Sequence, residues 1–271
     1  MSALEQIQIP ESAILWLVVA SVLLFIIPIL YAAVWKLRCG KKTRLKAFLI
    51  GGLGFFVTVR ILELGVHMFC IVFDNPVSRA INGNIFLYVL YGTLMAGVFE
   101  EVGRHVILKK LVKKENTLAN AVMYGIGHGG VEVWVITFLA MVSYLFIAIT
   151  FRSLPLEEAI TALNITEDTI EAALPSMMAI GSFGATSVFV TVLERVLCMF
   201  IHIGLTMIVY AGLKKDNRKY LYGAILLHMI MDTIPAIAQK MPLSPILTEG
   251  WVLIWTIIIM ILAKKATQGV E

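Results

Sequence analysis

Charge is scarce in this sequence, and its scarcity excludes an ordinary soluble domain. Only 15% of the 271 residues are charged and 59% are hydrophobic, whereas soluble domains carry about 25% charged and about 45–50% apolar residues. The mean hydropathy is +0.89. Linkers rich in proline or serine, low-complexity tracts and repeats of fixed period are also absent, so nothing marks a second domain. We expect one integral membrane domain over residues 1–271.

Cysteine is rare too, and its placement suggests no metal site of its own. Cys39, Cys70 and Cys198 lie far apart and in no CxxC pattern, which points to neither a thiolate metal site nor a disulfide framework. An HExxH helix, which would fix metal ligation, is missing as well. No basic region precedes the first apolar run, which is longer than the core of a signal peptide, so this run should remain as a helix.

Long apolar runs are what the sequence has instead. A helix needs about 20 mainly apolar residues to cross about 30 Å of hydrocarbon. Seven segments satisfy this: Ala13 to Trp35, Ala47 to Phe73, Ile85 to Leu108, Leu118 to Thr150, Gly181 to Leu213, Tyr220 to Ala238 and Ile246 to Ala263. The fold class predicted is therefore all-α, a polytopic transmembrane bundle of about seven helices in the lipid bilayer of the cell membrane.

Lysine and arginine between these segments predict an orientation, because cytoplasmic loops hold the excess of both. The first, third and fifth connections and the C-terminal segment hold 16 basic residues, and the other connections hold three. We therefore expect the N-terminus outside and the C-terminus in the cytoplasm. The basic residues are spread over short loops and form no stripe, so nucleic acid is not expected as a partner.

The fourth and fifth segments are longer than a membrane is thick. About 33 residues of helix measure about 50 Å, so these helices must tilt, kink or project beyond the bilayer. A break is expected at Gly125, Gly127, Gly129 and Gly130, where a missing Cβ weakens the helix and lets a neighbour approach.

Ionisable residues inside apolar segments carry the strongest functional signal. Each costs roughly 2.5–3.5 kcal/mol at mid-membrane and normally faces a bundle interior or a wet cavity. The helix at residues 13–35 holds none and the helix at 246–263 holds only Glu249, near its start; both are expected to be peripheral, while those within 47–73 and 85–238 should enclose a polar centre. The residues concerned are Arg60, Glu63, His67, Glu100, Glu101, Arg104, His105, His128, Glu132, Glu194, Arg195, His202, His228 and Asp232.

Four of these residues share one depth. Counted from the predicted cytoplasmic ends of their helices, Glu100, His128, His202 and His228 lie roughly 13–18 Å into the membrane. We expect a single site in the inner half of the bilayer. Residues three or four apart share a helix face, and this spacing brings further residues to the site: Glu101, Arg104, Glu132 and Asp232.

This set suits amide hydrolysis, which needs an activated water, a proton carrier and groups that stabilise an oxyanion. Glu100 is the expected general base, oriented by Arg104, and His128 would share the water. His228 with Asp232 would donate to the developing oxyanion or orient the donor.

A metal site is the alternative use of the same residues. Three histidines, His128, His202 and His228, with a Glu or Asp are the ligand types of a catalytic zinc site that keeps an open position for water. The residues leave both chemistries open, so Zn²⁺ stays a possible cofactor and none is certain.

The order of the motifs resembles a known clan of intramembrane proteases. The motifs are Glu100-Glu101-x-x-Arg104, Gly127-His128-Gly129-x-x-Glu132, Glu194-Arg195 with His202, and His228-x-x-x-Asp232. Between about Ile85 and Ala238 they are similar to the CAAX-prenyl-protease-2-like (CPBP) clan and, within it, to the YhfC-like membrane peptidase family. The resemblance implies a glutamate- or metal-dependent intramembrane protease that cleaves a membrane-embedded or lipid-modified peptide. The depth of the four residues predicts that the cut lies near the cytoplasmic face.

The resemblance also implies roles for single residues. Glu100 would be the catalytic glutamate with Arg104 as its partner, His128 the second residue that binds water, and His228 with Asp232 the pair on the oxyanion side.

Two features depart from the clan's pattern. Two residues instead of three separate the second glutamate from Arg104, so Glu100 and Glu101 are both candidates for the base. The last motif ends in Asp232 where asparagine is usual, which replaces an amide donor by an acceptor. His202 lies outside the clan's best-known set, and its role rests on its depth alone.

Other polar residues have simpler interpretations. Glu132, Glu194 and Arg195 are expected to support the site, the last two as an ion pair with each other. Arg60 with Glu63 is expected to form a structural ion pair, and His67 to be solvated near the outer interface.

Two other functions compete with hydrolysis. A proton-coupled transporter or channel also uses Glu, Asp and His inside the membrane, although the clustering at one level and the lack of an inverted repeat speak against it. An inactive relative that binds a transmembrane partner is the third.

Overall fold

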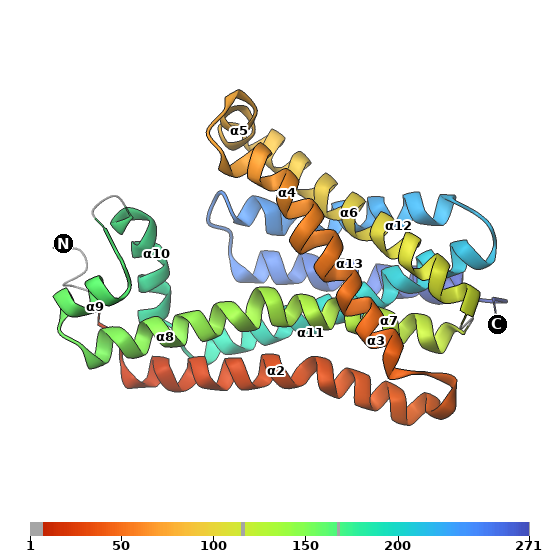
Figure 1. Cartoon of the computed structure of the whole chain (residues 1–271), viewed down its shortest axis with the longest axis horizontal. Helices are drawn as coiled ribbons and strands as arrows, with labels where there is room; N and C mark the ends of the chain where they lie inside the picture. Colours follow the sequence, from red (N-terminus) through yellow and green to blue (C-terminus); the bar gives the residue numbers. More distant parts are fainter. Residues whose placement is uncertain (1–7, 115–116, 167–168, 271) are drawn as a thin grey trace. The chain divides into compact units, whose positions relative to one another are not determined.

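Helices joined by short connections make up the structure, a computed structural model that describes residues 8–114, 117–166 and 169–270. Strands are absent from these three ranges, in agreement with the predicted all-α class. The helices are α2 (Glu11–Cys39), η1 (Gly40–Lys42), α3 (Leu45–Phe55), η2 (Phe56–Glu63), α4 (Leu64–His67), η3 (Met68–Val72), α5 (Pro76–Asn82), α6 (Ile85–Lys114), α7 (Leu118–Glu132), η4 (Val133–Phe138), α8 (Leu139–Ser153), α9 (Leu156–Ala162), α10 (Ile170–Gly181), α11 (Ala185–Lys214), α12 (Lys219–Ala238) and α13 (Pro245–Ala266). Figure 1 follows them along the chain.

Seven helical stretches of the described chain are long and apolar enough to cross a membrane, which confirms the predicted number. They are Glu11–Lys42, Leu45–Val72, Ile85–Leu111, Leu118–Ser153, Ala185–Lys214, Lys219–Ala238 and Pro245–Ala266. The fourth and fifth contain 36 and 30 residues, so both exceed the length that a bilayer requires, as expected.

The described chain divides into two compact units. The first comprises Met1–Ile26 and Val133–Arg195. In it, α8 packs against η4, α9 and α10. Phe25 stacks on Trp134 with ring centroids 5.9 Å apart, and the Trp134 indole donates to the Phe25 carbonyl at 3.0 Å.

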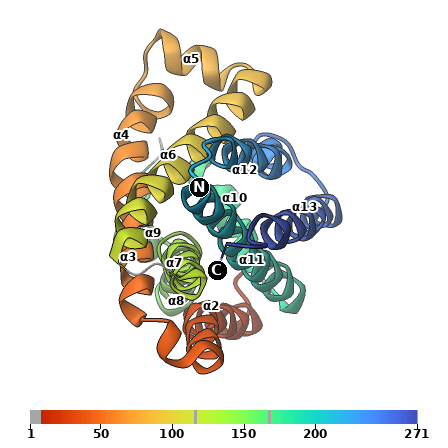
Figure 2. The ribbon, with the colours of Figure 1, turned by 90° about the vertical axis from the view of Figure 1, so that its right-hand side faces the viewer.

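The second unit comprises Ile27–Glu132 and Val196–Glu271. Its closest helix pairs are α3 with α7 and α6 with α12, and η2 also packs on α6. Figure 2 shows α3 running beside α7 in this unit.

The glycine cluster of α7 serves close packing, and the predicted break there is wrong. α7 continues as an α-helix through these glycines to Glu132, and the helix widens into the π-helical segment η4 only after them. A Cβ at Gly127 would lie 2.0 Å from the Phe48 carbonyl oxygen of α3. Only glycine allows the two backbones to meet at this distance, and the packing that results stabilises the helix that the glycines alone would weaken.

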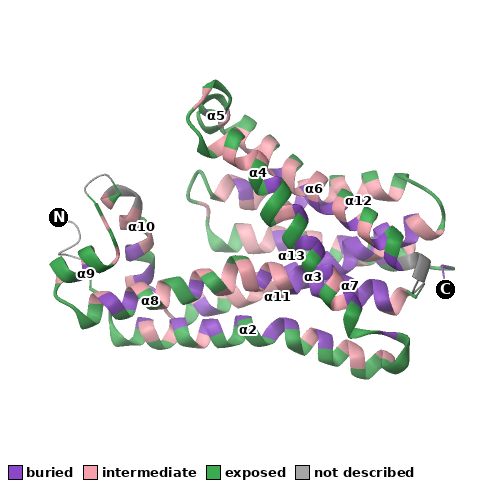
Figure 3. Cartoon of the chain, viewed as in Figure 1, coloured by how far each residue is buried: buried purple, intermediate pink, exposed green. Residues whose placement is uncertain are grey.

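α7 is the buried helix of the second unit. Every residue from Asn120 to Gly130 is buried, and Figure 3 colours the part of α7 that is visible mostly as buried. A helix that is enclosed all round suits a site that must exclude lipid, and this helix carries His128.

Candidate functional site

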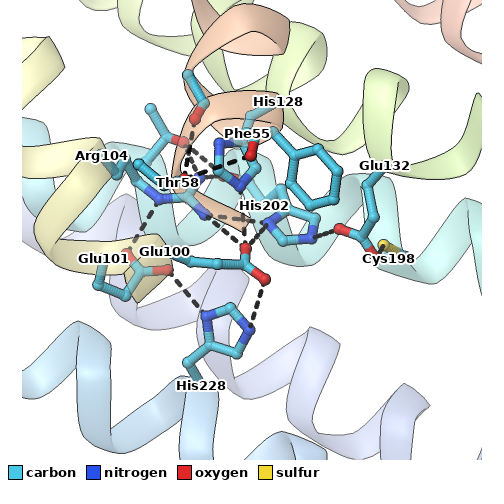
Figure 4. Close-up of polar contacts among 12 residues, drawn as sticks. Phe55, Thr58, Glu100, Glu101, Arg104, His128, Glu132, Cys198, His202 and His228 are labelled. Atoms are coloured by element: carbon cyan, nitrogen blue, oxygen red, sulfur yellow. Dashed lines mark hydrogen bonds and ion pairs between the residues drawn. The ribbon is translucent and has the colours of Figure 1, made fainter. Parts of the chain in front are cut away.

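Four helices of the second unit bring carboxylates and imidazoles into one buried cluster (Figure 4). The fully or nearly buried side chains are Glu100, Glu101 and Arg104 from α6, His128 from α7, His202 from α11 and His228 from α12. The structure therefore brings together the four residues that were expected at one depth. Phe55 of α3 closes one side, with its ring edge-on to His128 at 5.3 Å between centroids.

Arg104 lies at the centre of the cluster and is fully buried. Its Nε is 3.0 Å from Glu101 Oε2. One terminal nitrogen donates to the His202 carbonyl at 3.1 Å and to Thr206 Oγ1 at 2.6 Å, and the other lies 3.0 Å from His202 Nδ1. Arg104 therefore links α6 to both the backbone and the side chains of α11.

His228 contacts three carboxylates. Its Nδ1 is 2.9 Å from Glu101 Oε1. Its Nε2 is 3.3 Å from Asp232 Oδ2 and 3.9 Å from Glu100 Oε1. The pairing of His228 with Asp232 is the one that their spacing predicts, while the bond to Glu101 connects α12 to α6.

The two neighbouring glutamates have different surroundings. Glu101 is held by Arg104 on one oxygen and by His228 on the other. Glu100 has one hydrogen bond, from His128 Nε2 at 2.9 Å, and is 3.8 Å from Arg104. His202 Nδ1 lies 3.7 Å from Glu100 Oε2. Together with His128 and His228, three imidazoles therefore surround Glu100.

His202 is held on its other side by Glu132. The distance from His202 Nε2 to Glu132 Oε2 is 2.5 Å, and Glu132 Oε1 accepts a 3.4 Å hydrogen bond from Cys198. Glu132 thus contacts His202, one of the expected site residues. Its supporting role stays a prediction.

Two residues of the cluster were missed by the sequence analysis. Thr206 accepts from Arg104, and Cys198 donates to Glu132. Both lie four residues from His202 on α11, one before it and one after it. Helical phase around each candidate histidine would have found them.

Comparison with known proteins identifies the family. Residues 23–252 match the family described as YhfC intramembrane metalloprotease. The chain belongs to this family. It is also 30% identical over 232 residues, which are 86% of this chain and 87% of the other, to the "Uncharacterized membrane protein YhfC" of Bacillus subtilis (strain 168). No solved structure matches the chain. The resemblance to the YhfC family is confirmed, and the chain is a multi-pass integral membrane protein.

The name of the YhfC family implies a metal ion, and the residues present fit one. Glu100, His128 and His202 each offer one ligand atom, and these atoms lie within 4.8 Å of one another. Two imidazoles and a carboxylate are a donor set of catalytic zinc sites. His128 presents Nε2 to Glu100 at 2.9 Å, while its Nδ1 is buried and has no hydrogen-bond partner within the described ranges.

A second donor set shares His202 with the first. It consists of Glu132, Cys198 and His202, with ligand atoms again within 4.8 Å of one another. His228, the third imidazole expected around a metal, belongs to neither set in the described part of the chain. Its Nδ1 is bound to Glu101 instead.

Glu194 and Arg195 lie in the first compact unit. They form an ion pair with each other, with 2.5 Å between Arg195 and Glu194 Oε1. Their pairing was expected, and their supporting role at the site stays a prediction.

Proposed function

We propose that this YhfC family protein hydrolyses a peptide bond of a membrane-embedded or lipid-modified substrate, with Glu100 as the residue that takes the proton from water. The surroundings of Glu100 are the observation that carries the proposal. Of two adjacent buried glutamates, Glu101 has both oxygens occupied by Arg104 and His228. Glu100 keeps a single hydrogen bond and faces three imidazoles.

Water would bind where Glu100 and His128 meet. Glu100 Oε2 and His128 Nε2 are in hydrogen-bond contact at 2.9 Å, so a water molecule beside this pair would lie within reach of both side chains. When bound, a metal ion held by Glu100, His128 and His202 supplies Lewis-acid activation of that water. Glu100 Oε1 faces His228 and remains able to accept the proton.

His228 is proposed to serve the leaving group and the oxyanion. Its Nδ1–H donates to Glu101, and its Nε2 lies between Glu100 Oε1 and Asp232 Oδ2. A proton taken up by Glu100 can pass to His228 and from there to the amine that leaves. Arg104 is proposed to act as a positioning residue, because its contacts are with Glu101 and His202, which it orients.

Cleavage is proposed near the cytoplasmic face. The basic connections predict that α6, α7, α11 and α12 reach the site from the cytoplasmic side within roughly 13–18 Å. Accordingly, the substrate is a peptide or protein segment that enters the bilayer, because a site at this depth is out of reach of a soluble chain.

Cleavage and metal content should be measured side by side on purified wild type, Glu100→Gln and Glu101→Gln. The substrate is a membrane-embedded or lipid-modified peptide in liposomes. Loss of a general base typically costs about 10²–10⁴ in rate, so Glu100→Gln should abolish detectable turnover. It should leave folding nearly intact, because the isosteric amide removes a charge that is costly to bury.

Glu101→Gln is the matched control. It removes the carboxylate that pairs with Arg104, so it should lower the melting temperature more than Glu100→Gln does. If Glu101→Gln alone abolishes cleavage, the two glutamates have been assigned to the wrong roles. If neither change alters cleavage, the proposal of hydrolysis fails.

Proton-coupled transport is the second candidate function. One observation favours it, since polar groups continue from His228 to Asp232, whose side chain is 27% exposed. Proton flux into liposomes, lost in Glu100→Gln while no peptide is cleaved, would support transport. Neither flux nor cleavage in the wild type would favour an inactive homologue that binds a partner.

A further inference from the structure

A cavity lined partly by polar side chains lies beside the cluster and shares Asp232 with it. Its volume is about 470 Å³, and η2, α4, η3, α6 and α12 form its walls. Among its polar lining residues, Tyr88 and Gln239 lie near the ends of their helices, and further members are Glu63, His67, Tyr91 and Asp232. All of these residues belong to the second compact unit.

Glu63 and His67 differ from what the sequence suggested. Glu63 pairs with His67, four residues on, at 3.2 Å, while Arg60 is exposed. His67 Nδ1 is 2.7 Å from the Tyr91 hydroxyl of α6. The expected pair of Arg60 with Glu63 is therefore wrong, because the spacing of Glu63 and His67 places both on the face that lines the cavity.

Glu63 is a buried carboxylate with one oxygen unsatisfied. The residue is 4% exposed, and its Oε2 has no hydrogen-bond partner in the part of the chain described. A buried charge without full hydrogen bonding is costly. Buried water satisfies such groups where a cavity is large enough and offers two to four polar partners, and this cavity meets both conditions.

The cavity reaches the catalytic cluster through Asp232. This carboxylate lines the cavity and lies 3.3 Å from His228 Nε2. His228 Nε2 is in turn 3.9 Å from Glu100 Oε1. At the end of the cavity away from His228, the Tyr88 hydroxyl donates to Gln239 Oε1 at 2.9 Å. Gln239 directly follows the last residue of α12.

A neighbouring cavity on the same two helices provides a comparison. A second cavity of about 510 Å³ lies between α6 and α12. Residues such as Leu90, Leu226 and Ile230 line it, and none of its lining residues is ionisable. A cavity without ionisable lining residues and a cavity that carries Glu63, His67 and Asp232 thus border the same pair of helices.

We propose that the cavity bounded by Glu63, His67, Tyr91 and Asp232 is filled with water and is the route by which water reaches His228 and Glu100. With the predicted orientation the route opens on the outer side, since Asp232 and Gln239 lie progressively farther from the cytoplasmic end of α12. The inference rests on the proposed hydrolysis, because a hydrolase buried in lipid consumes a water at each turnover.

Cysteine accessibility tests the route without depending on activity. Single cysteines replace Ala96 and Ala236 in the polar cavity and Leu90 and Thr233 in the apolar one. The background carries Cys39→Ser and Cys70→Ser and keeps the buried Cys198. The probe is a charged, membrane-impermeant methanethiosulfonate added from the outside of right-side-out vesicles.

Labelling should be at least about tenfold faster at Ala96→Cys and Ala236→Cys than at the two control positions, because only a hydrated thiol forms the reactive thiolate. Equal rates at all four positions would overturn the proposal. So would labelling of the cavity positions from the cytoplasmic side alone, with the orientation established independently by loop cysteines.

Glu63 is tested by a pair of variants. Glu63→Leu should slow labelling of Ala236→Cys severalfold, because it removes a group that holds water, while Glu63→Gln should retain fast labelling. Arg60→Leu, an exposed change on the same segment, is the matched control. Unchanged labelling in a folded Glu63→Leu protein would count against the route. If this variant does not fold, the difference in labelling rate between the positions of the two cavities still tests the route.

The two proposals fail in different ways. Fast labelling in a protein that cleaves no peptide would support the wet cavity and contradict hydrolysis. Cleavage that depends on Glu100, together with slow labelling at both cavity positions, would support hydrolysis and overturn the route.

Discussion

A guanidinium offers five N–H donors in a fixed plane, and Arg104 directs them at groups on two helices. It contacts Glu101 on its own helix, and the His202 carbonyl, His202 Nδ1 and Thr206 on α11. A lysine carries the same charge but cannot reach these groups at once. At the scale of single residues, the shape of this side chain therefore matters as much as its charge.

Arg104→Lys should lower the free energy of unfolding by roughly 3 kcal/mol, because it leaves buried acceptors without donors. The measurement is unfolding of the purified protein in detergent, by denaturant titration. Arg60→Lys is the control, since Arg60 is exposed and surface changes typically stay within about 0.5 kcal/mol. Equal stability of the two variants would mean that the cluster does not depend on the guanidinium.

The sequence was sufficient for the charged members of the cluster and insufficient for the uncharged ones. Glu100, His128, His202 and His228 stand out because ionisable groups are rare in membrane helices. Cys198 does not, since cysteine is common in buried apolar positions. Which of two adjacent glutamates is held by arginine also depends on side-chain directions that spacing alone does not determine.

At the scale of helices, hydropathy predicted the spans and missed their irregularities. The seven segments follow from length and apolar composition. The π-helical segments η2, η3 and η4 were not expected, because a π-helical turn depends on tertiary packing more than on residue type. η2 ends at Glu63, so one of these segments sets the direction of a residue that lines the polar cavity.

The close packing of α3 on α7 predicts a strong effect at Gly127. A Cβ there would meet backbone atoms of Phe48 at 2.0–2.7 Å, which cannot rotate away as a side chain could. Gly127→Ala should therefore destabilise the protein by at least about 1–3 kcal/mol. It should also reduce cleavage, since α7 carries His128.

Gly223→Ala on α12 is the control for this change. Nothing lies within 4 Å of a Cβ at Gly223, so alanine should be neutral or stabilise the helix by up to about 1 kcal/mol. The melting temperatures of both variants in detergent provide the comparison. A Gly127→Ala protein as stable as Gly223→Ala would contradict the close approach of α3 and α7.

At the scale of the whole molecule, orientation in the membrane is the property that depends most on the sequence. The basic connections predict the C-terminus in the cytoplasm, and the single membrane domain over 1–271 likewise stays a prediction. Contacts among helices carry no information on which side faces out, because folding within the bilayer is the same for either orientation. Only the loop charges bear on it.

Two exposed positions outside the middle of the membrane segments test this orientation. A cysteine at Glu158 in α9 should react with an impermeant reagent in intact cells, and a cysteine at Lys110 near the end of α6 should react only after the membrane is opened. Background labelling is removed by Cys39→Ser and Cys70→Ser. The reverse pattern would mean that the orientation is inverted, with the proposed site and the mouth of the cavity in the opposite leaflets.

The ion pair within α6 has a consequence for how the protein is made. His228, the partner of Glu101 on α12, follows it by 127 residues, so α6 enters the bilayer long before α12 has been synthesised. Arg104 is three residues from Glu101 and enters the bilayer on the same helix. The positive charge of Arg104 can therefore offset the negative charge of Glu101 before α12 is inserted. The pair thus lowers the cost of membrane insertion at a stage when the buried cluster has not yet formed.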